Sequence, residues 1–245
     1  GGSPTSGCLF VEGVEPGDML SVEVGPFVVD PVAYTSFGGA NGAMPGWLDI
    51  GAHAKLVEIR DESIHWSDQL RLPLAPMLGF VGVAPAVERH HNGWGGDWGG
   101  NFDIQEITTG ATVVLPVNVE GALVHIGDMH AIQGDGEICG AGGIEASGTV
   151  RVACDIVPRP KGMLGPRIED KTHIATVAMA RPAEDAFRQA LSALLLWMEA
   201  EYRFTKADAY LWLGQVLEAR VTQFVNPTFT YIAKINRAFL PPAAG

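Results

Sequence analysis

The sequence predicts an α+β protein that is mainly β, with sandwich-like or barrel-like sheets and a C-terminal helical pair. Over the first 180 residues, short runs rich in β-branched and aromatic residues alternate with glycine, proline and aspartate turns. Hydrophobic residues then recur every three to four positions, which is the period of a helix that packs by one face. We therefore expect a β-rich catalytic core over residues 1–180. Residues 181–245, a helical pair and a closing strand, should pack on it within a single structural unit.

Nine segments have the composition of strands, and the clearest is GTVRVACDIV. There, Val150, Val152, Cys154 and Ile156 fall on one face of an extended chain. The predicted strands are residues 8–12, 19–24, 54–60, 78–85, 111–119, 122–128, 148–157, 173–180 and 228–234. The first two should form a hairpin or consecutive strands around a turn at residues 15–18. Residues 25–45 and 88–100, which are rich in glycine, read as loops.

The last quarter of the chain has the period and the end signals of helices. Residues 183–201 place alanine, leucine and methionine on one face, with Pro182 before them and two acids in the first turn. Thr205 and Asp208 have the spacing of a capping box and should open a second helix.

Composition excludes several classes of partner. The formal net charge is -12 and the pI is about 4.9, which disfavours nucleic acid and anionic membrane surfaces, since both need clustered lysine and arginine. No apolar run is long enough to span a bilayer, and no signal peptide opens the chain. Cys8, Cys139 and Cys154 are odd in number and widely spaced, so we expect no disulfide framework and a cytoplasmic location.

Acidic residues and a histidine gather among glycines between Trp98 and Gly148, which indicates a polar pocket. Asp128 and His130 are two residues apart, so in an extended segment both side chains leave the same face and could hold one divalent ion. The alternative is a surface loop with a hydrogen-bonded histidine. Further acids nearby favour a cation, a held proton or carboxyl pKa values raised by mutual repulsion.

At these residues the sequence resembles the acetamidase/formamidase family. The resemblance is carried by GGN-x-D at residues 99–103, LPV at 115–117, GD-x-H-x-x-QGDGE at 127–137 and the glutamate at 145. It extends to VEG-x-EPGD at 11–18 and to the segment around RVTQFVNP at 220–227, so it covers nearly the whole chain.

The resemblance implies hydrolysis of a small carboxamide to a carboxylate and ammonia. It also implies β-sheets with a C-terminal helical pair, a homo-oligomer, and a divalent metal, which we expect to be zinc, with calcium at a second place. Family members carry additional residues before the VEG-x-EPGD block. We therefore expect an N-terminal segment that is either missing here or supplied as a separate chain.

A mechanism with named roles follows. The metal ligands would be Asp103, Asp128 and His130, with Glu145 as a further ligand or an orienting carboxylate. Glu137 would take a proton from water and pass it to the leaving nitrogen, while Asn101 orients the substrate amide. Backbone N–H groups around Gly134 and Gly136 would stabilise the oxyanion, and Trp98 would line the mouth of the pocket.

Other interpretations stay open for these residues. Asn101 and Asp103 are also typical of a glycine-flanked turn, and Trp94 and Trp98 of a covered core. Cys139 raises the possibility of a cysteine nucleophile, which we rank lower because lysine is sparse around it. At the level of function, the alternatives are a lactamase that opens a cyclic amide and a noncatalytic β-domain that binds calcium and a ligand.

Overall fold

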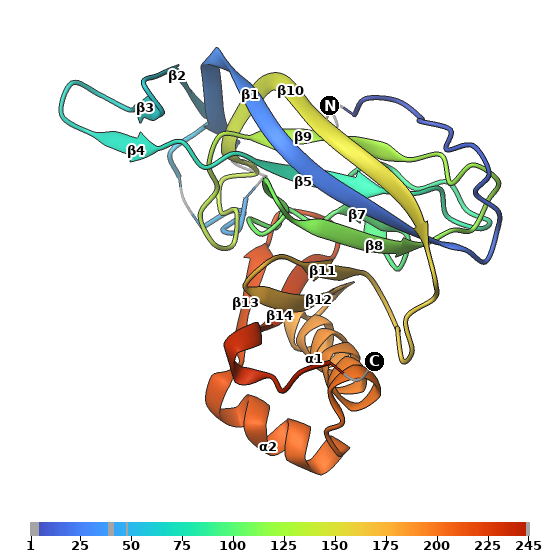
Figure 1. Ribbon diagram of the computed structural model, residues 1–245. Helices are drawn as coiled ribbons and strands as arrows, with labels where there is room; N and C mark the ends of the chain where they lie inside the picture. Colours follow the sequence, from blue (N-terminus) through green and yellow to red (C-terminus); the bar gives the residue numbers. More distant parts are fainter. Residues whose placement is uncertain (1–4, 39–41, 48, 244–245) are drawn as a thin grey trace.

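The computed structural model describes residues 5–38, 42–47 and 49–243, and its strands form one curled antiparallel sheet (Figure 1). Along the main path the order is β13-β14-β12-β11-β8-β1-β10-β9-β5-β7-β6, and β2, β3 and β4 extend from β1 as a projecting arm. The strands are β1 (Met19–Phe37), β2 (His53–Arg60), β3 (Ser63–His65), β4 (Arg71–Pro73), β5 (Met77–Gly82), β6 (Gly95–Gly96), β7 (Gly99–Asn101), β8 (Thr112–Pro116), β9 (His125–His130), β10 (Ala141–Val157), β11 (Arg167–Glu169), β12 (His173–Ala180), β13 (Glu218–Gln223) and β14 (Phe229–Asn236).

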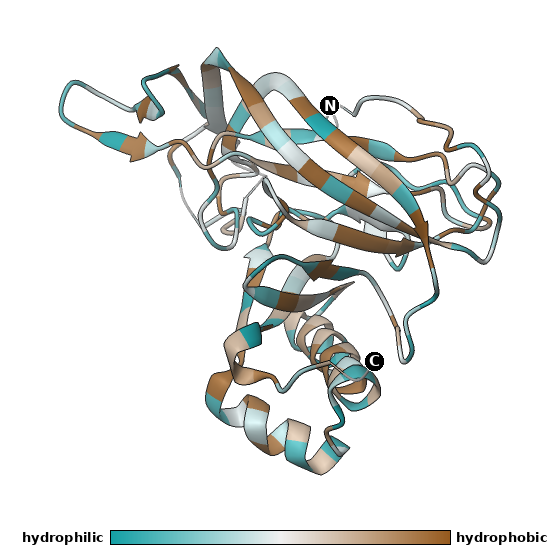
Figure 2. Ribbon diagram, in the orientation of Figure 1, coloured by the Kyte–Doolittle hydropathy of each residue, from teal (hydrophilic) through white to brown (hydrophobic). Residues whose placement is uncertain are grey.

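Two long strands, β1 and β10, pair along most of their length and organise the sheet. The predicted loop over residues 25–45 is wrong up to Phe37, because β1 continues through Pro26 and Pro31. The pairing tolerates both prolines at places where its register shifts, between Val24 and Phe27 and between Val29 and Ala33. Figure 2 shows hydrophobic and hydrophilic residues alternating along both strands, as expected for a sheet with two different faces.

The predicted strand at residues 8–12 is also wrong. Leu9 only forms an isolated bridge to Val124, and Gly7 and Gly13, both with positive φ, interrupt the extended chain on either side. The predicted loop at residues 88–100 contains the short strands β6 and β7. Gly99 lies against the backbone of Val81, so closely that a Cβ there would meet its carbonyl oxygen at 2.4 Å. Strands β2, β5, β8, β9, β10, β12 and β14 confirm the other predictions.

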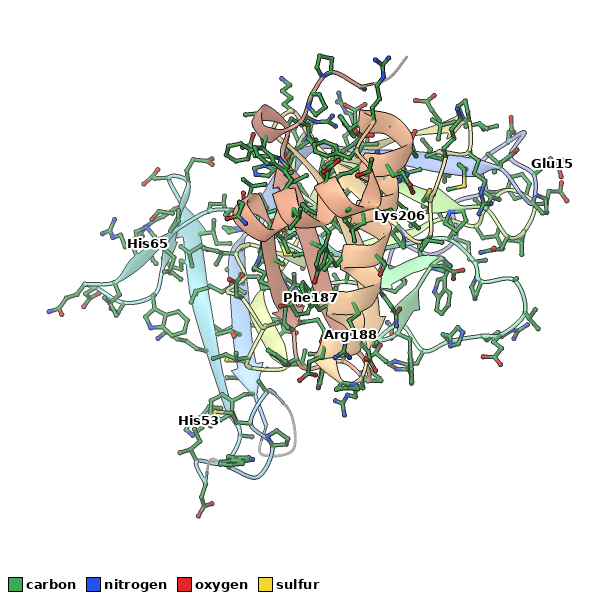
Figure 3. All side chains as sticks on the ribbon, turned by 90° about the horizontal axis from the view of Figure 1, so that it is seen from below. Glu15, His53, His65, Phe187, Arg188 and Lys206 are labelled. Atoms are coloured by element: carbon green, nitrogen blue, oxygen red, sulfur yellow. The ribbon has the colours of Figure 1, made fainter. Side chains whose placement is uncertain are left out.

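The helical pair is confirmed as α1 (Ala183–Tyr202) and α2 (Lys206–Val216). The Thr205 hydroxyl accepts a hydrogen bond from the Asp208 N–H at 3.1 Å, as the capping box predicts. Helix α1 packs on β12 and β14. Its residue Phe187 contacts Tyr231 of β14, with ring centroids 5.1 Å apart, while Arg188 forms an exposed ion pair with Asp185 (Figure 3).

Three buried clusters hold the fold together. The largest joins β1, β5, β8 and β12, the second lies between the helices and the strands β12 and β14, and the third lies under the β2–β3 arm. The predicted fold class, mainly β with a C-terminal helical pair, is therefore confirmed. Among the described residues, no helix has both the length and the apolar character needed to cross a bilayer.

Candidate active site

Five residues predicted from the sequence come together and are called the acid cluster below: Asp103, Asp128, His130, Glu137 and Glu145. Strand β9 supplies Asp128 and His130, whose side chains leave the same face as predicted, with Asp128 Oδ2 3.7 Å from His130 Nε2. Asp103 follows β7, Glu137 lies in the turn before β10, and Glu145 lies on β10. All are buried except Glu145, whose side chain reaches the surface in part.

Three acids of the cluster have left-handed backbone conformations. The φ angles are 49° at Asp103, 55° at Asp128 and 44° at Glu137. Residues other than glycine adopt this region rarely, and such residues gather at functional sites, where the surrounding structure holds them against their preference. The backbone is therefore bent at each position so that the carboxylates point toward one another.

Glycines provide the room for this crowding. A Cβ at Gly79, on β5, would lie 2.5 Å from both Asp103 Oδ1 and Asp128 Oδ2. One at Gly143 would lie 2.5 Å from the His130 ring, and one at Gly142 would lie 2.5 Å from Glu137 Cγ. Any larger residue at these positions would displace the acid cluster.

The orientation of His130 is fixed by Gln133. The Gln133 amide donates to the carbonyl oxygens of Asp103 at 2.7 Å and Thr222 at 3.1 Å, so its Oε1 is the atom that faces His130 Nδ1, at 2.8 Å. Nδ1 must therefore carry a proton and donate it to that oxygen. The other ring nitrogen, Nε2, points into the acid cluster, 3.4 Å from Glu145 Oε1.

Two asparagines hold one side of the Asp103 carboxylate. Asn101 Nδ2 donates to Asp103 Oδ2 at 2.9 Å, and Asn226 Nδ2 donates to the same oxygen at 2.8 Å. Oδ1 of Asp103 remains buried with no hydrogen-bond partner, as does Oδ1 of Asn101. Glu137 is arranged in the same way, since Oε1 accepts from the Gly142 N–H at 3.3 Å and Oε2 has no partner.

The electrostatics of the cluster follow from its burial. Burial, together with the charges of Glu137 and Asp128, raises the pKa of Asp103 well above its usual value. Burial raises the pKa of Glu137 to about 8, against the nearby Asp103 carboxyl and the Gly142 N–H and with help from the charges of Asp128 and Glu145. Burial lowers the pKa of His130, but the contact with Glu145 and the charges of Asp128 and Asp103 outweigh it and raise this pKa to about 9.

The donor set fits a divalent cation. Oδ1 of Asp103, Nε2 of His130 and Oε2 of Glu137 are buried without hydrogen-bond partners, and these residues can offer ligand atoms within 4.8 Å of one another. Asp128, His130 and Glu145 form a second such group that shares His130. Buried polar atoms in native proteins are normally satisfied, so unpartnered atoms converging on one point are what a cation would bind.

Arg220, on β13, ties two loops of the acid cluster together. Its guanidinium contacts Glu106 at 2.6 Å, three residues after Asp103, and Asp135 at 2.8 Å, two residues before Glu137. Lys234 adds a second cation to Glu106 at 3.0 Å. The C-terminal strands thus support the loops that carry two of the acids.

Some predicted site residues lie elsewhere. Trp98 stacks on His90, with centroids 4.6 Å apart, and lines a separate cavity of about 640 Å³ to which no residue of the acid cluster contributes among the described parts of the chain. Gly136 is buried, and its carbonyl accepts the Phe224 N–H at 2.9 Å, whereas Gly134 is exposed. Cys139 lines another cavity, with Lys55 and Trp66.

Sequence reasoning gave no role to Gln133, Asn226, Gly79 or Tyr34. Gln133 and Asn226 lie inside the QGDGE and RVTQFVNP motifs, so the motifs marked them without showing what they contact. Tyr34 lies within the predicted loop at residues 25–45. In the structure it pairs with Glu145 across β1 and β10, and its pKa is raised by burial and by the charges of Glu145 and Asp128.

Comparison with solved structures finds the same architecture in two acetamidases. The chain superposes on the crystal structure of acetamidase from Bacillus halodurans with a TM-score of 0.91 and 34% identity, over 96% of this chain and 79% of that one. For acetamidase from Yersinia enterocolitica the TM-score is 0.87 and the identity 30%, over 96% and 74% of the two chains. A gamma lactamase from Delftia acidovorans, at a TM-score of 0.61 and 18% identity, shares the fold alone.

Sequence comparison points the same way. The acetamidase of Mycolicibacterium smegmatis is 46% identical over 59 residues, and the formamidase of Methylophilus methylotrophus is 41% identical over 61 residues. These segments span 24% and 25% of this chain but only 14% and 15% of the two relatives. The profile of the acetamidase/formamidase family matches residues 94–236, which include the whole acid cluster and more than half of the chain. The chain therefore belongs to the acetamidase/formamidase family.

Proposed function

We propose that this chain is a metal-dependent amidohydrolase that cleaves the C–N bond of small carboxamides to a carboxylate and ammonia. The observation that carries the proposal is that Asp103, His130 and Glu137 each have a buried atom without a hydrogen-bond partner and offer ligand atoms within 4.8 Å of one another. Membership of the family supports the reaction class, and the acid cluster supplies the groups that the reaction needs.

We assign Asp103, Asp128 and His130 to hold the metal, with Glu145 as a further ligand or an orienting carboxylate. Nε2 of His130 lies 3.7 Å from Asp128 Oδ2 and 3.4 Å from Glu145 Oε1. One imidazole nitrogen among carboxylate oxygens favours zinc over calcium, which prefers oxygen ligands alone. A bound zinc ion would polarise the amide carbonyl and lower the pKa of a water molecule. The Gln133 contact matters here because it leaves Nε2 of His130 as the nitrogen that faces the metal.

We assign the proton transfer to Glu137. Its Oε2 is free and buried within the acid cluster, while its Oε1 is held by the Gly142 N–H. Burial raises the pKa of Glu137 to about 8 in the metal-free protein, so its carboxylate holds a proton more tightly than an ordinary glutamate does. We assign it to take the proton of the attacking water and to give it to the nitrogen that leaves.

Asn101 would orient the substrate through its oxygen. Its Nδ2 is committed to Asp103, which leaves the buried Oδ1 to accept a hydrogen bond from the substrate NH₂ group. The backbone N–H groups of Gly134 and Gly136 stay the proposed donors to the oxyanion.

The test is ammonia release from formamide and acetamide, with ring opening of a bicyclic γ-lactam scored alongside. Each substrate is assayed before and after chelator treatment, with metal content measured on the same samples. Turnover that is lost with the chelator and restored by zinc supports the proposal. Ring opening without ammonia release would favour the lactamase alternative. A folded, metal-loaded protein that turns over none of the three would refute amide hydrolysis and favour a calcium-binding or ligand-binding domain.

A further inference from the structure

A histidine on β9 points away from the acid cluster. Successive residues of a strand point to opposite faces of the sheet, so His125 leaves the face opposite to the one that carries Asp128 and His130. Phe80, on the neighbouring strand β5, lies beside it with ring centroids 6.5 Å apart (Figure 1). The His125 ring is therefore available for chemistry that the acid cluster does not use.

The start of the described chain brings a cysteine to this histidine. Two isolated bridges pair residues 5–9 with residues 124–127, so that five residues face four. The extra residue makes this pairing a bulge, and bulges redirect side chains. Gly7, with a φ of 83°, lies within it, and the next residue, Cys8, places its Sγ 3.0 Å from His125 Nε2. Cys8 and His125 are called the thiol–imidazole pair below.

The contact makes Cys8 a candidate nucleophile. The thiolate is the form of cysteine that attacks, and an imidazole within hydrogen-bond distance can take the proton of the thiol. Cys8 is also exposed, whereas Cys139 and Cys154 are half-buried. Burial and the charge of Asp155 raise the pKa of Cys154, which keeps that thiol protonated. Cys8 should therefore be the most reactive of the three thiols.

Covalent chemistry suits the thiol–imidazole pair better than metal binding does. A protein site for zinc needs three or four ligands. Among residues 5–38, 42–47 and 49–243, the groups of three or more potential ligands within 4.8 Å of one another both belong to the acid cluster. The pair thus offers two ligands, which is enough for a nucleophile and its base.

The thiol–imidazole pair opens into the cavity of about 640 Å³ that Trp98 lines. Its wall is largely aromatic, because His90 stacks on Trp98 and lies 6.3 Å, between ring centroids, from Trp94. Arg89 adds a cation to the lining. A cavity of this size accommodates a small molecule, aromatic side chains favour a flat ring, and a guanidinium favours a carboxylate.

We propose that Cys8 is a thiol–disulfide exchange site for small aromatic disulfides that carry a carboxylate. The Cys8 sulfur attacks one sulfur of the bound disulfide, and the proton of the thiol passes to His125 Nε2. A new S–S bond to Cys8 forms as the S–S bond of the ligand breaks, and the second half of the ligand leaves as a thiolate with the electron pair of that bond. The ligand is itself the oxidant. Cys8 lies outside residues 94–236, which the family profile matches, and amide hydrolysis gives it no role.

The experiment uses the full chain with Cys139→Ser and Cys154→Ser, so that Cys8 is its only thiol. The probe is dithiobis(nitrobenzoate), an aromatic disulfide with carboxylates, whose released thiolate is measured by absorbance. Each rate at neutral pH is divided by the rate of N-acetylcysteine with the same reagent. The same ratio is measured for hydroxyethyl disulfide, which has no ring, and thermal midpoints show that each variant is folded.

The ratio for the aromatic disulfide should be about ten or more, because a base and a binding cavity both assist Cys8. His125→Gln should lower it about tenfold, because the thiol loses its base. The control His65→Gln, on β3, should leave it unchanged. Trp94→Leu should lower the ratio about threefold to tenfold for the aromatic disulfide alone, because it removes an aromatic contact. In the wild type, peptide mapping after brief exposure should find the probe on Cys8 first.

Each part of the proposal can fail separately. A ratio near one, or labelling of Cys139 or Cys154 before Cys8, overturns the exchange site, because Cys8 is then an ordinary exposed thiol. Equal rates in His125→Gln and His65→Gln overturn the role of His125 as the base. Equal ratios for the two disulfides that Trp94→Leu does not change overturn the aromatic ligand class.

Discussion

Replacing Gly79 by alanine adds one methyl group beneath the acid cluster. The added Cβ would lie 2.5 Å from Asp103 Oδ1, 2.5 Å from Asp128 Oδ2 and 3.0 Å from the Asp128 carbonyl oxygen. Ordinary contacts of this kind are about 3.5 Å, so each carboxylate must move by roughly 1 Å. The backbone itself accepts alanine, because Gly79 is not among the residues with positive φ.

The consequence of that displacement can be stated in numbers. Metal–ligand distances in a zinc site tolerate about 0.2 Å, and a displacement of about 1 Å at a reaction centre can cost about 100-fold in rate. We expect Gly79→Ala to lose most of its zinc and about 100-fold in kcat/KM. Overpacking in the core should cost a further 1–3 kcal/mol of stability, roughly.

Zinc content by elemental analysis and amide turnover under saturating zinc are the two measurements. Gly214→Ala, on α2, is the matched control, because no heavy atom lies within 4 Å of the added Cβ and its φ is not positive. The reasoning fails if Gly79→Ala binds zinc and turns over amides like the wild type. It also fails if Gly214→Ala loses as much zinc as Gly79→Ala does.

Four further predictions follow from the same contacts. Glu137→Gln should keep zinc and lose turnover, whereas His130→Ala should lose both; a Glu137→Gln variant at the wild-type rate removes Glu137 from the chemistry. Gln133→Leu should weaken zinc binding about 10-fold to 100-fold in a competitive chelator titration, because His130 loses its orienting contact; unchanged affinity would contradict that role. Arg220→Met should lower kcat about tenfold, because a shift of the two loops by a fraction of an ångström misplaces their acids. Its control, Arg188→Met, breaks an exposed ion pair and should change stability by less than about 0.5 kcal/mol. Equal effects of the two variants on kcat would exclude a positioning role for Arg220. In chelator-treated protein the thermal midpoint should fall as the pH rises from 5 to 9. Glu137 and His130 have folded pKa values of about 8 and about 9, above their unfolded values, so their stabilisation is complete at low pH and is lost as the pH rises through those values. A midpoint that rises with pH would contradict this reasoning, and excess zinc should reduce the fall.

The sequence predicts the parts of the acid cluster that depend on local spacing. Asp128 and His130 share a face because they are two residues apart in a strand, and this holds although Asp128 bends the backbone. Gln133 and Asn226 could not be assigned in this way. Asn226 meets Asp103 across 123 positions of sequence, through a sheet whose order joins β13 and β14 to the core only by way of β12.

Strand β1 shows why a strand can form where the local sequence predicts a loop. Pro26 and Pro31 favour a loop, since proline cannot donate to a neighbouring strand. Pairing with β10 continues across them by shifting register, so tertiary contacts outweigh the local preference. The loop prediction hid Tyr34, because no residue in a loop can be assigned to a face of a sheet. The role of Gly79 could not be predicted either, because the two acids that it contacts, Asp103 and Asp128, come from other segments of the chain.

The buried carboxylates of the acid cluster repel one another, and either protons or a divalent cation can relieve that repulsion. Four carboxylates removed from water repel one another and lose hydration, which raises the pKa values of Asp103 and Glu137. Protons can relieve this repulsion, and so can a divalent cation at the same point. Protons alone would leave the buried atoms of Asp103 and His130 without partners, whereas a cation would bind both and would leave Oε2 of Glu137 to accept a proton beside it. The dependence of stability on pH distinguishes the two, because zinc binds the deprotonated ligands and should raise the pH at which the folded state is most stable.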